Sequence, residues 1–204
     1  MLHAALMTVI LYDDDIRSRL DARDAVRWMG EAIDANYCGD LVAPPRVHAD
    51  LGDGRIVFTT GRLRGSWFGY RSYDTFPTEP GSQLVAVHDE SSGEMRDIAI
   101  GNELGPRRTG AIGEVAAEAL ASPTATIAAL IGTGTQALTQ LWALSTVRDL
   151  TQVRCSPATQ PGEKSSPSWR SVCTAWCATL RQPLVMPSTA RRSSFSPPTA
   201  RHQL

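Results

Sequence analysis

The sequence predicts an α/β protein with an N-terminal α+β domain, an incomplete Rossmann-like domain after it, and a disordered tail. Three observations lead to this prediction. A helical stretch and several strands separated by turns occupy residues 1–120. A strand, a glycine turn and a helix follow within 121–153, as at the start of a βαβ unit. Residues 154–204 then show no regular apolar pattern.

Charge is distributed unevenly along the 204 residues, although the formal net charge is only -1. Residues 1–153 hold 20 acidic and 13 basic side chains, whereas 154–204 hold one acid, six arginines and one lysine. The balanced total argues against nucleic acid as a partner, because proteins that bind nucleic acid normally present a basic face.

Neither a membrane span nor a metal site is predicted. No apolar run approaches the roughly 20 residues that cross a bilayer, and residues 1–12 lack the basic start and cleavage site of a secretory signal. We therefore expect a cytoplasmic protein with no membrane partner. The four cysteines lack the paired spacing of a zinc site, and they are Cys38, Cys155, Cys173 and Cys177.

Residues 13–39 are predicted to form two helices that meet near Leu20 and Asp21. Asp21 is a suitable N-cap for the second helix, and Gly39 is a suitable stop. The apolar residues of the second helix recur at helical spacing, and they are Val26, Met29, Ile33 and Tyr37.

The pattern changes to that of strands after Pro44 and Pro45. Residues 47–51 and 55–60 flank Gly52-Asp53-Gly54, which predicts a hairpin because Asp-Gly supplies the positive φ angles of tight turns. Further strands are expected at 67–73, 84–88 and 95–100. Helix and antiparallel sheet together give a domain of ordinary size.

Residues 107–120 return to helical spacing, and Ser122-Pro123 ends that helix. An apolar strand at 127–131, a glycine turn and a helix to Val147 follow. A second strand is expected to begin near Leu150 but not to continue past Val153.

The glycine turn has the spacing of a dinucleotide-binding motif. Gly132 permits the tight turn, Gly134 lets backbone amides approach a pyrophosphate, and the small Ala137 lets helix and strand pack closely. The turn follows an apolar strand and opens a helix, which favours a dinucleotide site over a chance glycine turn.

Arginines occur in or next to three of the predicted elements. Arg46 precedes a strand, Arg71 lies within an aromatic strand, and Arg107 and Arg108 begin a helix. Guanidinium groups bind carboxylates in a bidentate manner, so their convergence would create a carboxylate pocket. The alternative is a set of separate surface arginines, and the residues alone favour that alternative.

Five motifs resemble, in order, those of the ornithine cyclodeaminase/mu-crystallin family, and they lie at 43–46, 69–71, 84–87, 105–111 and 130–137. The resemblance covers about residues 8–153. It implies a first domain that binds an amino-acid or imino-acid substrate and forms a homodimer, and a Rossmann domain that binds NAD or NADP.

The resemblance also implies residue roles. Arg46 and Arg108 match carboxylate-binding arginines, whereas Arg71 stands where members typically have lysine, which puts ornithine itself in doubt as the substrate. The catalytic aspartate of the family lies downstream of the matched part, so the catalytic residues are unknown. The cofactor-binding positions implied are Thr109, Gly132, Thr133, Gly134, Thr135, Gln136 and Ala137.

The family pattern is lost near Arg154. Residues 154–163 and 189–200, read one base out of phase, can spell later segments of a Rossmann domain, so a frameshift near codon 154 is our leading account of the tail. The alternative is a genuine disordered segment, since 21 of the residues 154–204 are Ser, Thr or Pro.

Three functions remain open. The first is an NAD(P)-dependent enzyme that carries out cyclodeamination or reduction, impaired in this chain. The second is a non-catalytic protein that binds nucleotide and a small ligand, resembling mu-crystallin. The third is an inactive remnant. We expect cofactor binding to be weak or absent, because no residue after Val153 matches the family's ribose-reading position.

Overall fold

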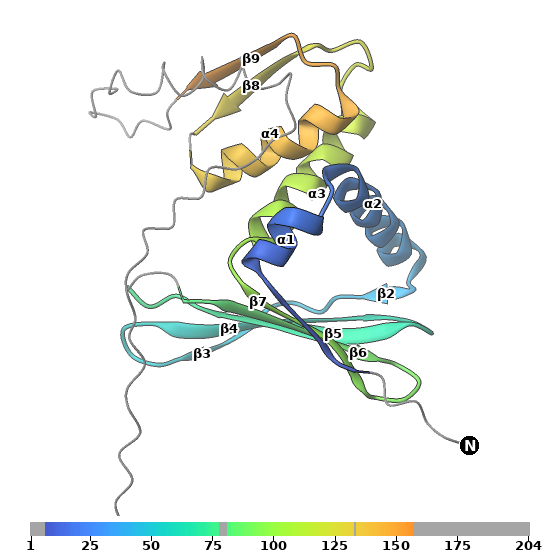
Figure 1. Ribbon diagram of the computed structural model, residues 1–204, viewed down its shortest axis with the longest axis vertical. Helices are drawn as coiled ribbons and strands as arrows, with labels where there is room; N and C mark the ends of the chain where they lie inside the picture. Colours follow the sequence, from blue (N-terminus) through green and yellow to red (C-terminus); the bar gives the residue numbers. More distant parts are fainter. Residues whose placement is uncertain (1–6, 78–80, 133, 157–204) are drawn as a thin grey trace, which may run out of the picture.

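The computed structural model describes residues 7–77, 81–132 and 134–156. Within these ranges, helices lie between a large sheet and a small one (Figure 1). The large sheet comprises β1 (Val9–Tyr12), β2 (Leu41–Val42), β3 (Val47–Asp50), β4 (Arg55–Leu63), β5 (Trp67–Asp74), β6 (Gln83–Asp89) and β7 (Met95–Gly101). The small sheet pairs β8 (Ile127–Ile131) with β9 (Gln152–Ser156). The helices are α1 (Asp13–Arg19), α2 (Ala22–Cys38), α3 (Leu104–Leu120) and α4 (Thr135–Val147).

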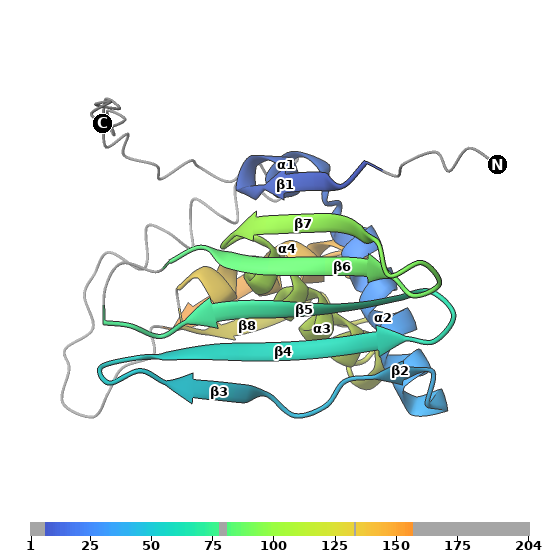
Figure 2. The same ribbon diagram turned by 90° about the horizontal axis from the view of Figure 1, so that it is seen from below.

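The large sheet has the order β1-β7-β6-β5-β4-β2, with β3 also paired to β4. All its pairs are antiparallel except the parallel pair of β1 and β7. Helices cover one face, and Figure 2 shows that no described element covers the other. We call these the inner and the outer face. Because side chains alternate along a strand, successive residues of β5 point to opposite faces.

Local signals explain the helix boundaries. The Asp21 carboxylate accepts a hydrogen bond from the Arg23 amide at 2.8 Å, and Gly39 ends α2 in the left-handed region with φ 82°. Asp13, at the start of α1, accepts hydrogen bonds from the amides of Asn102 and Glu103 at 2.8 and 2.9 Å. The Asp13 carboxylate therefore links the start of α1 to the start of α3.

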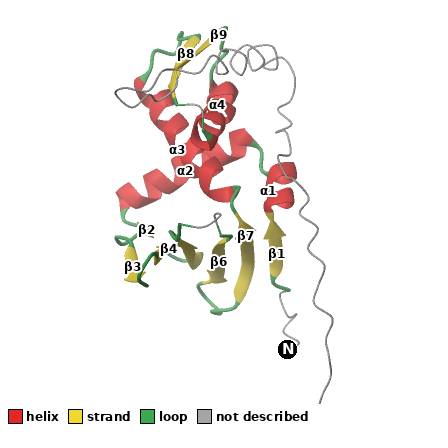
Figure 3. Cartoon of the chain, turned by 90° about the vertical axis from the view of Figure 1, so that its left-hand side faces the viewer, coloured by secondary structure: helices red, strands yellow, loops and turns green. Residues whose placement is uncertain are grey.

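The helices α2, α3 and α4 lie on the same side of the large sheet (Figure 3). Mostly small side chains and one tryptophan form the core that they share. Glycines allow α3 and α4 to approach closely, since a Cβ on Gly110 would lie 2.3 Å from the Thr139 carbonyl oxygen. The core therefore crosses the expected boundary at residue 120. Its buried residues are Ala22, Ala25, Val26, Ala111, Trp142 and Ala143.

The predicted α/β fold class is confirmed, with four local differences. The strands β1 and β2 were not predicted, and α3 begins at Leu104 rather than at residue 107. In the first hairpin the positive φ belongs to Gly52 rather than to the Asp-Gly pair after it. The expected end of the last strand at Val153 is wrong, because β9 continues to Ser156. The rest of the predicted tail, 157–204, lies outside the described residues.

No helix in the described ranges is long and apolar enough to span a membrane. Those ranges also contain no cluster of His, Cys, Asp or Glu side chains suited to hold a metal ion. The expected cytoplasmic location stays a prediction.

Candidate functional site

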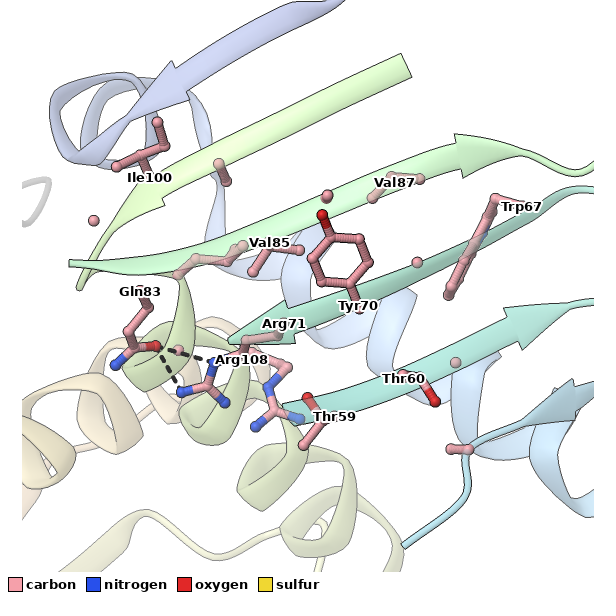
Figure 4. Close-up of a pocket in the computed structure, with 18 of the residues that line it drawn as sticks. Thr59, Thr60, Trp67, Tyr70, Arg71, Gln83, Val85, Val87, Ile100 and Arg108 are labelled. Carbon is pink, nitrogen blue, oxygen red and sulfur yellow. Dashed lines mark hydrogen bonds between the residues drawn. The ribbon is translucent and has the colours of Figure 1, made fainter. Parts of the chain in front are cut away.

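A cavity of about 430 Å³ lies between the inner face of the large sheet and the start of α3. Strands β4 to β7 provide its floor, and the loop between β2 and β3 closes one side. The side chains of Arg46, Arg71 and Arg108 all line it, although they come from a loop, a strand and a helix. The structure therefore brings together the three arginines that the resemblance singled out. Figure 4 shows Arg71 and Arg108 side by side at one end of the cavity.

Arg71 is held in place by a neighbouring strand. Its Nε and Nη2 atoms donate hydrogen bonds to Oε1 of Gln83, at 3.1 and 2.6 Å. A Cβ on Gly105 would lie 2.9 Å from that same oxygen, so a larger residue at this position would displace the Gln83 side chain. The guanidinium carbon Cζ of Arg71 also lies over the Tyr73 ring, 4.6 Å from its centre, in a cation–π contact.

The other two arginines lie near this pair. Nη1 of Arg46 donates a hydrogen bond to the Tyr73 hydroxyl at 3.4 Å, so one tyrosine contacts two of the three cations. Burial lowers the pKa of Arg71, and the positive charges of Arg108 and Arg46 lower it further. An arginine keeps its charge despite such a shift, so the three side chains form a cationic end of the cavity.

Among the described residues, no carboxylate forms an ion pair with Arg46, Arg71 or Arg108. The one acidic side chain among the described lining residues is Asp13, whose oxygens already accept hydrogen bonds from backbone amides. Arg71 is partly buried, whereas Arg46 and Arg108 are exposed. A partly buried cation without a counter-ion is costly unless a ligand supplies the negative charge. The arrangement is therefore suited to bind a carboxylate.

The second predicted site is the glycine turn between β8 and α4. Gly132 has φ 104°, which glycine adopts readily, and Gly134 is the N-cap of α4. No side chain caps the helix, and a Cβ on either glycine would meet nothing within 4 Å. The space beside the turn thus fits a pyrophosphate, which binds to backbone amides at a helix N-terminus. Of the other predicted residues, Thr135, Gln136 and Ala137 form the first turn of α4, and Thr133 lies outside the described residues.

Thr109 lies on α3 and not in the glycine turn. Its hydroxyl donates to the Gly105 carbonyl oxygen at 2.9 Å, and its own carbonyl accepts from Nε2 of Gln140, on α4, at 3.4 Å. The assigned cofactor role of Thr109 stays a prediction.

Sequence reasoning missed three contributors to the cationic end, namely Gln83, Gly105 and Tyr73. Gln83 carries no distinguishing signal, because an isolated glutamine in a strand is ordinary. Gly105 appeared only as the first residue of the motif at 105–111, and its close approach to Gln83 was not predicted.

Comparisons with known proteins agree with this architecture. A model of the ornithine cyclodeaminase/mu-crystallin family matches residues 7–171. The match extends beyond residue 153, where the resemblance was expected to end. Alanine dehydrogenase from Archaeoglobus fulgidus is 27% identical over 172 residues, which cover 81% of this chain and 52% of the relative. L-lysine cyclodeaminase from Streptomyces rapamycinicus is 44% identical over 72 residues, 35% of this chain and 21% of the relative.

Solved structures show the same fold. An archaeal alanine dehydrogenase dimer with bound NAD superposes with a TM-score of 0.71 at 25% sequence identity. The match covers 83% of this chain and 53% of that structure. The chain thus spans about half the length of the relatives that match most of it.

Proposed function

Because this chain belongs to the ornithine cyclodeaminase/mu-crystallin family, we propose that it serves the NAD(P)-dependent conversion of an amino or imino acid, by cyclodeamination or reduction. The observation that carries the proposal is the convergence of three arginines on one cavity without a paired carboxylate. We assign Arg46, Arg71 and Arg108 to the substrate's α-carboxylate. Bidentate guanidinium contacts would fix the plane of that carboxylate and so orient the neighbouring α-carbon.

The glycine turn is proposed to hold the pyrophosphate of the cofactor. Backbone amides at the start of α4 and the open space beside Gly132 and Gly134 support this assignment. When bound, the nicotinamide would supply or accept the hydride of the reaction. The core that joins α3 to α4 fixes the glycine turn relative to Arg108. The choice between NAD and NADP depends on residues beyond β9.

A non-catalytic protein that binds a nucleotide and a small ligand is the second candidate. The observation in its favour concerns acid–base groups. No histidine, lysine or cysteine lines the described part of the cavity, and Asp13 is engaged with the start of α3. The described residues therefore provide groups for binding but no free side chain suited to proton transfer near neutral pH.

We further propose that the chain forms a homodimer through the outer face of the large sheet. Exposed apolar side chains gather there, and a relative of similar fold is a dimer. Contiguous apolar surface of this kind marks interaction sites more often than free surface. The residues concerned are Ile10, Val47, Phe58, Phe68 and Tyr70.

Calorimetric titration of the chain with pyruvate tests the carboxylate site. Arg108→Ala should weaken binding roughly tenfold or more, since a charge-assisted hydrogen bond contributes about 1.5–3 kcal/mol. Arg64→Ala is the control, because Arg64 is exposed and pairs with Asp40 at 3.8 Å, outside the cavity lining. Equal binding by both variants would contradict the proposal. Consumption of NADH with pyruvate and ammonium then separates an enzyme from a protein that only binds.

A further inference from the structure

We propose that this site selects substrates with an uncharged, apolar side chain and rejects diamino acids. The inference rests on the proposed function, since it takes the α-carboxylate to lie at the three arginines. It concerns the opposite end of the cavity, where the substrate's side chain would lie. Figure 4 shows Val87 and Trp67 displaced along the strands from Arg71, Arg108 and Gln83.

The register of the sheet defines that end. Arg71 pairs with Thr59 on one side and Val85 on the other, and these residues share the inner face. Two residues earlier on β5, Gly69 pairs with Gly61 on β4 and with Val87 on β6. These three residues form the next row on the inner face. Two of its three members have no side chain, and all three line the cavity; we call this part of the cavity, next to the arginines, the hollow.

Apolar groups surround this hollow. Trp67 follows in the next row of the inner face, and Val87 closes the side toward β6. Ala43 and Pro44, from the loop after β2, line the same cavity. A substrate side chain that leaves the α-carbon toward this end would contact hydrocarbon, and each buried methylene contributes about 0.8 kcal/mol.

The ammonium group of a substrate side chain has no carboxylate partner among the described residues at this end of the cavity. Among the described lining residues, the sole carboxylate is Asp13, which is engaged with backbone amides at the start of α3. The three arginines add positive charge to the cavity and repel a second cation. An ornithine or lysine side chain would therefore lose its hydration without gaining an ion pair.

A second carboxylate is also disfavoured. The arginines would already bind the α-carboxylate, and two hydrogen bonds from Arg71 go to Gln83. At the hollow, the backbone groups of β4, β5 and β6 pair with one another in the ladder. Among the described lining residues, the distal end therefore offers no cation to a second anion.

Three amino acids with the same number of carbon atoms but different groups at the end of the side chain test the inference, namely L-norvaline, L-ornithine and L-glutamate. Calorimetric titration of the full chain should give binding to norvaline at least tenfold tighter than to ornithine or glutamate. Equal or tighter binding of ornithine or glutamate would overturn the inference while leaving the carboxylate site intact. Absence of binding for all three, together with no binding of pyruvate, would instead overturn the proposed function on which it rests.

A pair of variants isolates the charge at the hollow. Val87→Asp places a carboxylate at this end, and Val87→Asn is its neutral match in shape. Ornithine should bind Val87→Asp at least tenfold more tightly than Val87→Asn, while norvaline should bind Val87→Asp no more tightly than it binds Val87→Asn. Circular dichroism confirms that both variants fold. No gain for ornithine in a folded Val87→Asp protein would show that the substrate's side chain lies elsewhere, which contradicts the inference.

Discussion

Glu114 is a buried carboxyl side chain on α3, only 2% exposed. No described atom donates a hydrogen bond to its Oε1, and the nearby Nε of Arg148 is likewise without a partner in the described part of the chain. Burial raises the pKa of Glu114 to about 7, although the charge of Arg148 opposes this effect. Glu114 therefore keeps its proton up to a higher pH in the folded protein than in the unfolded chain.

Stability should consequently depend on pH through Glu114. The pKa of the folded state, about 7, exceeds the ordinary value of 4.5, so the unfolded chain releases the proton first as pH rises. The free energy of unfolding should fall between about pH 4.5 and 7, by on the order of 2 kcal/mol. Urea unfolding at pH 5 and pH 8 measures this fall, and Glu114→Gln should remove it. The exposed Glu94→Gln is the control, and an unchanged pH dependence in Glu114→Gln would contradict the assignment.

The arginines show what single residues reveal in the sequence. Taken alone, Arg46, Arg71 and Arg108 fit separate surface positions better than a shared pocket, and only the order of the motifs around them suggested convergence. Their convergence depends on tertiary structure, because β5, α3 and the loop before β3 are distant in sequence. The contact of Gln83 with Arg71 also depends on tertiary structure, because the register of β5 and β6 places these two side chains together.

Elements with strong local signals were predictable, and elements without them were not. The helix α2 has a cap at each end and a clear apolar period, and its bounds agree with prediction to within one residue. The strand β1 has four residues, mostly exposed, and its partner β7 lies far along the chain, so no local pattern indicates it. The helix α3 begins three residues before the predicted start at 107, and it includes Pro106, which is tolerated because it lies in the first turn.

The crossing of α3 and α4 gives a prediction with an unusual sign. Replacing a helical glycine by alanine normally stabilises by roughly 0.5–1 kcal/mol. Gly110→Ala should instead destabilise by about 1–3 kcal/mol, because its Cβ would meet the backbone of Thr139 at 2.3 Å. Gly30→Ala on α2 is the matched control, since its nearest neighbour, a methyl group of Val115, lies 4.0 Å away. Thermal unfolding compares the two, and stabilisation by both would show that α4 does not pack on α3 as described.

At the scale of the whole molecule, the outer face of the large sheet remains without a covering element in the described part (Figure 2). Aromatic rings contact one another on this face, since Phe68 stacks on His88 at 4.9 Å between ring centres and the ring centre of Tyr70 lies 6.3 Å from that of His88. Phe58 is 36% exposed and Phe68 38% exposed, so both present area to solvent. A second copy of the face would bury this area by symmetry.

The last prediction concerns this face. Phe68→Glu should raise the dissociation constant of the proposed dimer at least tenfold, because two charges would be desolvated at a self-complementary interface. Tyr37→Glu is the control, since Tyr37 is 92% exposed at the end of α2, away from the sheet face. Sedimentation equilibrium of the full chain measures the constants. A monomeric wild-type protein at micromolar concentration, or equal dimerisation of both variants, would contradict association through the outer face.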